Sequence, residues 1–262
     1  MTSFGRSVAE NYEQWMVPLL FEPYACNLAE RAARSAPERV LEIAAGTGAL
    51  TRQLAMRLPD ATIVATDLAP AMLERAAALG AARPVEWRAA DAQALPFADA
   101  SFDLVACQFG VMFFPDRVAA YREFHRVLRP GGRALVSTWD RLDTNVFAHE
   151  VNAAMSAQFP DDPPLFFARV PHGYFDHAVI RAELAAAGFG EPSIEEVVLL
   201  GHASGSEVPA RALICGTPLR GEIEKRGALD DAIAAATMRI RARLGDGEIA
   251  AEMCAFVIDV QR

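Results

Sequence analysis

Residues 40–48, Val40-Leu41-Glu42-Ile43-Ala44-Ala45-Gly46-Thr47-Gly48, decide the fold of this chain of 262 residues. The first five are typical of a buried strand, and two glycines follow in a turn before a helix predicted over residues 49–58. A glycine-rich turn at this place lets the backbone approach a ligand, and the helix N-terminus offers free N–H donors. The stretch therefore predicts a ligand site at the carboxyl end of a parallel strand.

Outward from this stretch, short apolar runs alternate with helical segments. Further strands are predicted at 62–66, 85–88, 103–107 and 133–139, and two more at 194–200 and 253–260. Helices are predicted at 8–34, with breaks at Pro18 and Pro23, and at 118–128, 146–158, 179–187 and most of 206–244. Strands that alternate with helices at this spacing indicate right-handed βαβ units in a doubly wound α/β sheet.

An acidic residue closes the second predicted strand. Asp67 lies 19 residues after Gly48, where its carboxylate can accept both hydroxyls of a ribose at the carboxyl edge of the sheet. Taken alone, the glycines and Asp67 also fit a nicotinamide cofactor. They fit equally a purely structural turn, in which Asp67 caps the next helix.

Residues 40–48 closely resemble the first motif of class I S-adenosylmethionine-dependent methyltransferases, a strand and an acidic residue followed by G-x-G-x-G. Ala44 replaces the first glycine, a change we expect to be tolerated if its φ stays below zero. Three further stretches match the family in order: Asp91–Phe97 its D-A-x-x-L-P-F segment, Ser101–Val105 its fourth strand, and Arg126–Gly132 its R-V-L-K/R-P-G-G turn. The detailed resemblance covers about residues 36–140.

The resemblance implies a Rossmann-like sheet of seven strands, mostly parallel with an antiparallel last strand, helices on both faces and an added lid. It implies S-adenosyl-L-methionine as the cofactor, with Asp67 on the ribose, Leu68 against the adenine and Asp91 accepting from the adenine amino group. Tyr12 and Trp15 resemble a helix that closes over the cofactor. The expected cofactor-binding residues are Tyr12, Trp15, Glu42, Ala44, Gly46, Gly48, Asp67, Leu68, Met72, Asp91, Ala92, Gln93 and Gln108.

We expect a single methyltransferase domain over 1–262. Within it lie an N-terminal helical cap at 1–35, a cofactor-binding core at 36–140, a substrate lid at 141–176 and the rest of the sheet at 177–262. The lid is inferred because residues 141–176 interrupt the helix-strand alternation with prolines and aromatics, and long excursions of this kind are usually binding loops. His149 and His172 within it are candidate bases, although the sequence favours a structural role for each taken alone.

Composition narrows the partners. The net charge of −9 disfavours nucleic acid, whose affinity for proteins depends on Lys and Arg neutralising phosphates. No apolar run approaches the ~20 residues that span a bilayer. The four cysteines are scattered without a C-x-x-C pair, which disfavours a metal site or a disulfide framework. We expect a cytoplasmic monomer or homodimer that acts on a small molecule.

The expected reaction is methyl transfer to an O, N or C nucleophile of a small molecule. Phe109, Met112, Phe113 and Phe114 follow the fourth predicted strand, and with Phe166 and Phe167 they favour an aromatic or apolar acceptor. A nicotinamide-dependent oxidoreductase is the alternative, although Thr51 stands where it would need a third glycine. A non-catalytic protein that binds S-adenosylmethionine would carry the same motifs.

Overall fold

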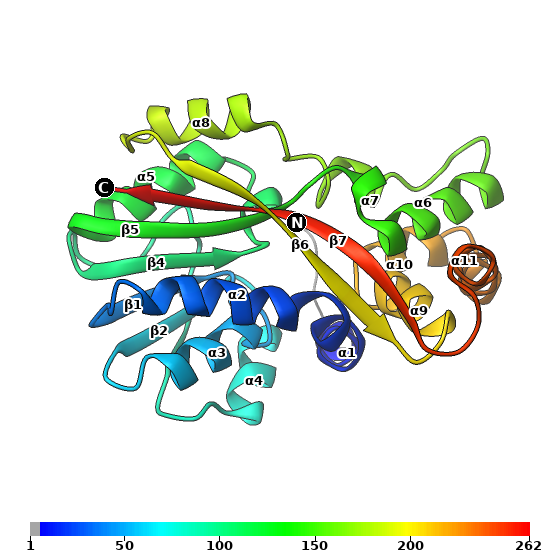
Figure 1. Ribbon diagram of the computed structural model, residues 1–262, viewed down its shortest axis with the longest axis horizontal. Coiled ribbons are helices and arrows are strands. Elements are labelled where there is room, and N and C mark those ends of the chain that lie inside the picture. Colours follow the sequence, from blue (N-terminus) through cyan, green and yellow to red (C-terminus); the bar gives the residue numbers. More distant parts are fainter. Residues whose placement is uncertain (1–5) are drawn as a thin grey trace. The chain divides into compact units, whose positions relative to one another are not determined.

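A computed structural model describes residues 6–262 and contains one mixed sheet of seven strands (Figure 1). Their order is β3-β2-β1-β4-β5-β7-β6. The strands are β1 (Arg39–Ile43), β2 (Thr62–Asp67), β3 (Glu86–Ala89), β4 (Phe102–Gln108), β5 (Leu128–Trp139), β6 (Ser193–Ala203) and β7 (Ile249–Gln261). The first five pair in parallel, and β7 runs antiparallel to β5. The predicted fold class is confirmed.

The helices alternate with the strands over the first half of the chain. They are α1 (Arg6–Asn11), α2 (Glu22–Ala33), α3 (Ala49–Arg57), α4 (Pro70–Leu79), α5 (Arg117–Val127), α6 (Val146–Gln158), α7 (Phe166–Arg169), α8 (His177–Ala186), α9 (Glu207–Cys215), α10 (Leu219–Glu224) and α11 (Leu229–Leu244). A π-helix over Tyr12–Phe21 joins α1 to α2, and short 3-10 turns lie at Val111–Phe113 and Leu142–Thr144.

The chain divides into two compact units. We call residues 24–139, 174–197 and 255–262 the sheet unit, and residues up to 23, 140–173 and 198–254 the helical unit. The divisions after residues 139 and 173 lie near the changes we expected at 140 and 176, whereas the division after residue 23 precedes the expected change at 35. Strands β6 and β7 each begin in one unit and end in the other. That the two units act as one methyltransferase domain stays a prediction.

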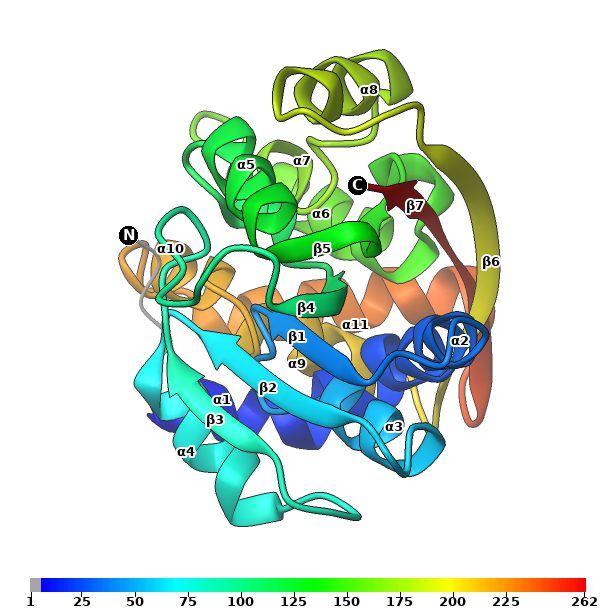
Figure 2. The ribbon, with the colours of Figure 1, turned by 90° about the vertical axis from the view of Figure 1, so that its left-hand side faces the viewer.

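The core of the sheet unit consists of parallel strands covered on both faces. Figure 2 shows α2, α3 and α4 on one face of the sheet and α5 and α8 on the other. Strands β1 and β4 lie at the centre, and their apolar side chains are buried almost completely. Continuous burial of this kind explains the uninterrupted apolar runs of the sequence. Tyr24 of α2 adds a contact, because its hydroxyl donates to the carbonyl of Val197 at 3.0 Å.

The N-terminal helical segment differs from the prediction of breaks at Pro18 and Pro23. Pro18 lies inside the π-helix, and Pro23 is the second residue of α2, so the segment stays helical from residue 6 to 33. A π-helix has wider turns that accommodate local irregularity, and proline is tolerated in the first turn of an α-helix. Neither proline therefore ends the helix, since Pro18 lies within a π-helical stretch and Pro23 in the first turn of α2.

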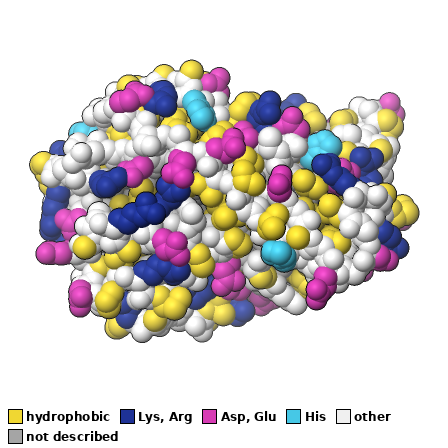
Figure 3. All heavy atoms as spheres, in the orientation of Figure 1, with side chains coloured by type: hydrophobic (Ala, Val, Ile, Leu, Met, Phe, Trp, Pro, Cys, Tyr) yellow, Lys and Arg dark blue, Asp and Glu magenta, His cyan; other side chains and the backbone are white. Residues whose placement is uncertain are grey.

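Charged side chains of both signs are interspersed over the face shown in Figure 3. The whole chain has 25 basic and 34 acidic residues. None of the helices within residues 6–262 combines the length and the apolar composition needed to cross a membrane.

In the helical unit, a buried carboxylate joins α6 to α11. Glu150 of α6 is 5% exposed and accepts from Arg239 at 3.0 Å and from Arg243 at 2.7 Å, both on α11. Because the two arginines approach from successive turns of one helix, the carboxylate fixes the rotation of α11 against α6.

We expect Glu150→Ala to lower the free energy of unfolding by about 1–3 kcal/mol, since it removes charged hydrogen bonds from a buried position. Urea unfolding followed by circular dichroism measures this change. Glu224→Ala, which breaks an exposed pair with Arg220 on one helix, is the control and should change stability by about 0.5 kcal/mol at most. Equal effects of the two variants would contradict the role given to Glu150.

Candidate functional site

The carboxyl ends of β1, β2 and β3 lie side by side in the sheet unit and bring the predicted nucleoside-binding residues together. Ile43 pairs with Thr66, and Asp67 pairs with Ala89, so the loops after the three strands begin at one edge. Hydrogen bonds connect these loops, since Ala45 N–H donates to Thr66 O at 2.9 Å and Ala90 N–H to Asp67 O at 3.1 Å. This is the edge at which parallel α/β sheets bind ligands.

Asp67 holds the loop after β1 in place. Its Oδ2 accepts from the N–H of Gly46 and its Oδ1 from the N–H of Ala69, both at 2.8 Å. Burial raises the pKa of Asp67, while the N–H groups of Ala69, Gly46 and Leu68 act to lower it. Because each carboxylate oxygen can accept two hydrogen bonds, each retains capacity for a ribose hydroxyl. The N-cap residue of α4 is Ala69, so Asp67 is not the N-cap of that helix.

Glu42 is the most buried acid of the site. It is 1% exposed, and its Oε2 has no hydrogen-bond partner among the residues that the structure describes. Burial raises its pKa to about 8, and Asp67 adds to this, whereas Thr51 and Arg52 act in the other direction. A buried oxygen without a partner at the end of β1 fits a ligand that supplies an N–H or a cationic group.

Ala44 does not meet the condition under which we expected it to replace a glycine. Its φ is +55°, in the left-handed region that favours glycine. A Cβ on Gly110, which follows β4, would lie 2.6 Å from the Cβ of Ala44 and 2.8 Å from the Sγ of Cys107. The loops after β1 and β4 are therefore packed together with no space for a second methyl group.

Gly48 serves packing more directly than ligand approach. Its φ is +84°, and a Cβ there would lie 2.9 Å from the ring of Trp87 on β3 and 3.3 Å from the Cβ of Ala76 on α4. The glycine thus lets the start of α3 lie against its neighbours. Gly46, with φ +57°, supplies the N–H that Asp67 binds.

The segment after β3 contains Asp91, Ala92 and Gln93. Asp91 Oδ1 accepts from the N–H of Gln93 at 2.9 Å, and Gln93 Oε1 accepts from the N–H of Asp116 at 2.9 Å. Asp91 is exposed, while Ala92 is 7% exposed. The side chain of Gln93 thus anchors the segment to the start of α5, a contact that the sequence did not predict.

The remaining predicted cofactor residues divide between the units. Leu68 is 61% exposed, and Met72 is a buried residue of α4. Gln108 pairs with Ser137 at the carboxyl ends of β4 and β5. Tyr12 and Trp15 belong to the helical unit, where Tyr12 stacks on Phe21 at 4.9 Å, and their part in cofactor binding stays a prediction.

Three aromatic residues pack at the carboxyl ends of β4 and β5. Phe109 stacks on Trp139 with ring centroids 3.9 Å apart, and Tyr24 meets both rings edge-on at 5.2 and 5.3 Å. Phe109 has φ +54°, which is unusual for a bulky residue. All three are buried, so Phe109 belongs to the core, whereas Phe113 on the following turn is 37% exposed.

The two candidate bases lie in the helical unit. His172 is 6% exposed, and its Nδ1 lies 2.7 Å from the carbonyl of Asp140. Burial lowers its pKa to about 4, so it is uncharged at neutral pH but a weak base. His149 Nδ1 lies 3.4 Å from Glu150 Oε1. Both histidines belong to the helical unit, and a role for either in catalysis stays a prediction.

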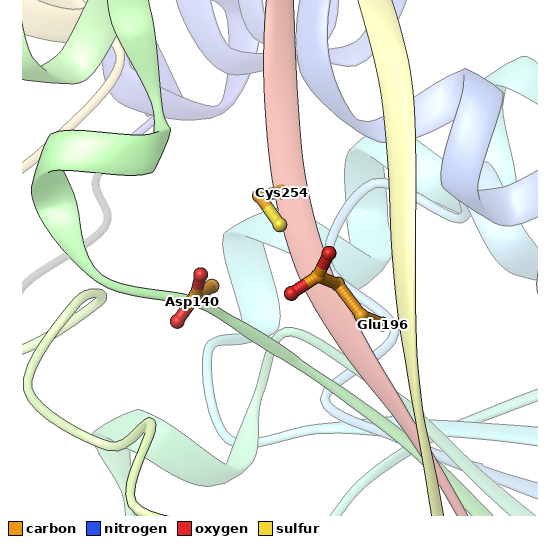
Figure 4. Close-up of side chains that lie close together, drawn as sticks. All are labelled: Asp140, Glu196 and Cys254. Carbon is orange, nitrogen blue, oxygen red and sulfur yellow. The ribbon is translucent and has the colours of Figure 1, made fainter.

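One group of potential metal ligands occurs among residues 6–262, consisting of Asp140, Glu196 and Cys254 (Figure 4). Asp140 and Cys254 belong to the helical unit, where the N–H of Asp140 donates to the carbonyl of Cys254 at 3.0 Å. Glu196 belongs to the sheet unit and is exposed. Since its members come from both units, we assign no metal site to this group.

We expect Ala44→Gly to raise the free energy of unfolding by about 0.5–1 kcal/mol. The gain is the relief of an unfavourable φ, offset in part by the greater chain entropy of glycine when unfolded. Chemical unfolding of both proteins measures it. Ala45→Gly is the matched control, because Ala45 has no positive φ and should lose stability instead. A loss of stability in Ala44→Gly would contradict the strain at this position.

We expect stability to fall with rising pH because of Glu42. Its pKa is raised from 4.5 to about 8 in the folded protein, so between about pH 5 and 8 the folded chain binds more protons than the unfolded chain. The favourable contribution is therefore complete below the lower value and is lost as the pH rises through the higher one. Glu42→Gln remains uncharged and lacks this dependence.

Urea unfolding of the ligand-free protein from pH 5 to 9 tests this expectation. The difference in unfolding free energy between Glu42→Gln and the unaltered protein should grow in favour of the variant up to about pH 8 and then level off. Parallel pH profiles would show that Glu42 titrates normally.

Comparison with known proteins agrees with this geometry. Residues 41–136 match the family model described as "Methyltransferase domain". A demethylmenaquinone methyltransferase of Thermus thermophilus is 47% identical over 107 residues, which are 40% of this chain and 49% of that protein. One of Mycolicibacterium vanbaalenii is 35% identical over 166 residues, 60% of this chain and 70% of that protein. The chain thus spans about half the length of the Thermus relative.

Solved structures share the fold. The YcgJ protein of Bacillus subtilis superposes with a TM-score of 0.58 at 21% identity, over 90% of this chain and 98% of that one. At this identity the likeness supports the fold alone, and the matches in sequence support the family. The chain belongs to the class I S-adenosylmethionine-dependent methyltransferases.

Proposed function

We propose that this protein transfers the methyl group of S-adenosylmethionine to a small molecule that contains an aromatic ring. The observation that supports this most is the pair of acids at the ends of β1 and β2. Asp67 orders the glycine-containing loop and keeps acceptor capacity, and Glu42 has a buried oxygen without a partner in the described structure. A cytoplasmic location and action as a monomer or homodimer, without nucleic acid or membrane, complete the proposal.

The chain's own residues would bind and orient the donor, whose sulfonium supplies an electrophilic methyl group and a good leaving group. Asp67 would accept from the ribose hydroxyls, and Asp91 Oδ2, which has no partner in the described structure, from the adenine amino group. Leu68 would cover the adenine ring. Orientation of the two reactants can supply roughly 7–11 kcal/mol of the barrier reduction, so a dedicated base is required only when the acceptor is protonated.

The aromatic acceptor is proposed from two observations. Phe113 is 37% exposed on the turn after β4, at the edge where the ligand lies in such sheets. Two relatives are named demethylmenaquinone methyltransferase, and another is named "Ubiquinone/menaquinone biosynthesis C-methyltransferase UbiE". A phenol or hydroquinone ring would fit both, with its ring against Phe113 and an O or C nucleophile facing the methyl group.

Residues 141–176, together with Tyr12 and Trp15, are proposed to close over the site as a lid. The chain enters this segment directly from the carboxyl end of β5, which is the edge that the acceptor must approach. Phe166 and Phe167 lie 5.4 Å apart and are buried within the helical unit. A lid of this kind would exclude water during transfer.

We expect Asp67→Ala to weaken binding of S-adenosylhomocysteine by about 1.5–3 kcal/mol, the range for hydrogen bonds to a charged group. Isothermal titration calorimetry measures the dissociation constant. Asp60→Ala, at an exposed acid before β2, is the control and should bind normally. An unchanged constant for a folded Asp67→Ala protein would mean that Asp67 only orders the turn.

We expect the purified protein to convert S-adenosylmethionine to S-adenosylhomocysteine in the presence of reduced 1,4-naphthoquinones or substituted phenols. Mass spectrometry should find the acceptor heavier by one methylene unit, and Asp67→Ala should slow its formation. Turnover with aliphatic acceptors alone would refute the aromatic proposal. Donor binding without turnover of any acceptor would favour a non-catalytic protein, and binding of a nicotinamide cofactor alone would favour an oxidoreductase.

A further inference from the structure

Arg126, in the R-V-L-R-P-G-G stretch at the end of α5, makes an unusual number of contacts with one segment of the sheet unit. Its guanidinium donates to the carbonyls of Leu95 at 2.9 Å and Phe97 at 2.7 Å, and to Asp99 Oδ1 at 2.7 Å. All three partners belong to the segment that leads from β3 to β4 and begins with Asp91. The stretch at the end of α5 therefore holds the segment that contains Asp91, although the stretch itself does not lie at the carboxyl edge.

Glu123, one turn earlier on α5, completes the arrangement. Its two carboxylate oxygens each accept from Arg126 at 2.7 Å, and Oε2 also accepts from the N–H of Leu95 at 2.7 Å. Arg126 holds the pKa of Glu123 below its ordinary value. The pair therefore binds both backbone groups of Leu95, whose side chain is 5% exposed. Four charge-assisted hydrogen bonds thus run from the pair to this irregular segment and fix its backbone.

The other end of α5 holds the beginning of the same segment. Asp116, the N-cap of α5, accepts from the N–H of Ala119 at 2.9 Å and donates its own N–H to Gln93 Oε1 at 2.9 Å. Between these anchors the segment has no strand or helix, only an isolated bridge from Asp91 to Ala94. Its position relative to the sheet is therefore set by α5.

We propose that Glu123 and Arg126 are positioning residues for adenine recognition. This inference rests on the proposed function, in which Asp91 accepts from the adenine amino group. By holding Leu95 and Phe97, the pair places the turn that presents Asp91, although neither residue reaches the carboxyl edge itself. Loss of the pair would let the turn move, and discrimination between an amino and an oxo group at that position of the base would fall.

The test compares two ligands by calorimetry, S-adenosylhomocysteine and S-inosylhomocysteine, which carries an oxo group in place of the adenine amino group. The unaltered protein should prefer the first. In Arg126→Gln we expect the affinity for S-adenosylhomocysteine to fall about tenfold and that for the inosine analogue to fall much less, so the preference narrows. In steady-state assays, the KM for the donor should rise while kcat changes little.

Arg129→Gln is the matched control. Arg129 lies in the same stretch and pairs with Asp103 at 2.7 Å, but within the described part of the chain it makes no hydrogen bond or ion pair with the segment from Asp91 to Asp99. The affinities of the Arg129→Gln protein for both ligands should stay unchanged. Circular dichroism and thermal unfolding of each variant verify folding. Glu123→Gln keeps an acceptor for Leu95 and should narrow the preference for S-adenosylhomocysteine less than Arg126→Gln does. If Arg126→Gln does not fold, the preference of Glu123→Gln is the test instead, and an unchanged preference would overturn the inference.

An unchanged preference in folded Arg126→Gln would overturn the inference, and so would an equal loss of affinity for both ligands, since that is the result of a merely structural role. Failure of the unaltered protein to bind S-adenosylhomocysteine would instead overturn the proposed function. The two failures are therefore distinguishable in one series of titrations.

Discussion

The carboxylate of Asp67 is the contact on which the carboxyl edge of the sheet unit depends. It binds the N–H of Gly46 from the loop after β1 and the N–H of Ala69 from the turn into α4. One side chain thereby fixes the loops after two neighbouring strands. Its burial raises the pKa and favours the protonated form, and these donors counteract that effect in part. A ligand that binds its remaining lone pairs meets an edge that is already ordered.

The sequence predicted the central strands well, because strands covered on both faces appear as continuous apolar runs. Leu104–Cys107 is such a run, Val40–Ile43 is apolar except for Glu42, and both stretches proved buried. The helix at 146–158 was predicted with its observed bounds. The last strand was predicted from residues 253–260, whereas its antiparallel direction came from the resemblance and was indicated by no periodicity. Of the candidate site, Gly46, Gly48 and Asp67 were predicted from their places along the chain, and Glu42 from the resemblance.

Other features depend on contacts between distant residues, which local patterns do not record. The helical unit assembles three separate stretches, so no single change in composition marks it. The hydrogen bonds from Arg126 to Leu95 and Phe97 join residues about 30 positions apart. The sequence predicts a break at Pro18, because proline usually disrupts a helix, whereas the structure has a π-helix there. Backbone conformation at Ala44 likewise follows from the loop as a whole.

The packing of Ala44 against Gly110 makes two positions, 66 residues apart in the chain, share one compartment. The space between the two loops holds one methyl group, and here the Cβ of Ala44 fills it. Glycine at position 44 would leave this space empty, but alanine at position 110 would still lie 2.8 Å from the Sγ of Cys107, so that side chain would have to move as well. Substitution at either position is therefore constrained by the residue at the other. One of the two loops must keep a glycine at this contact if the other is to carry a side chain.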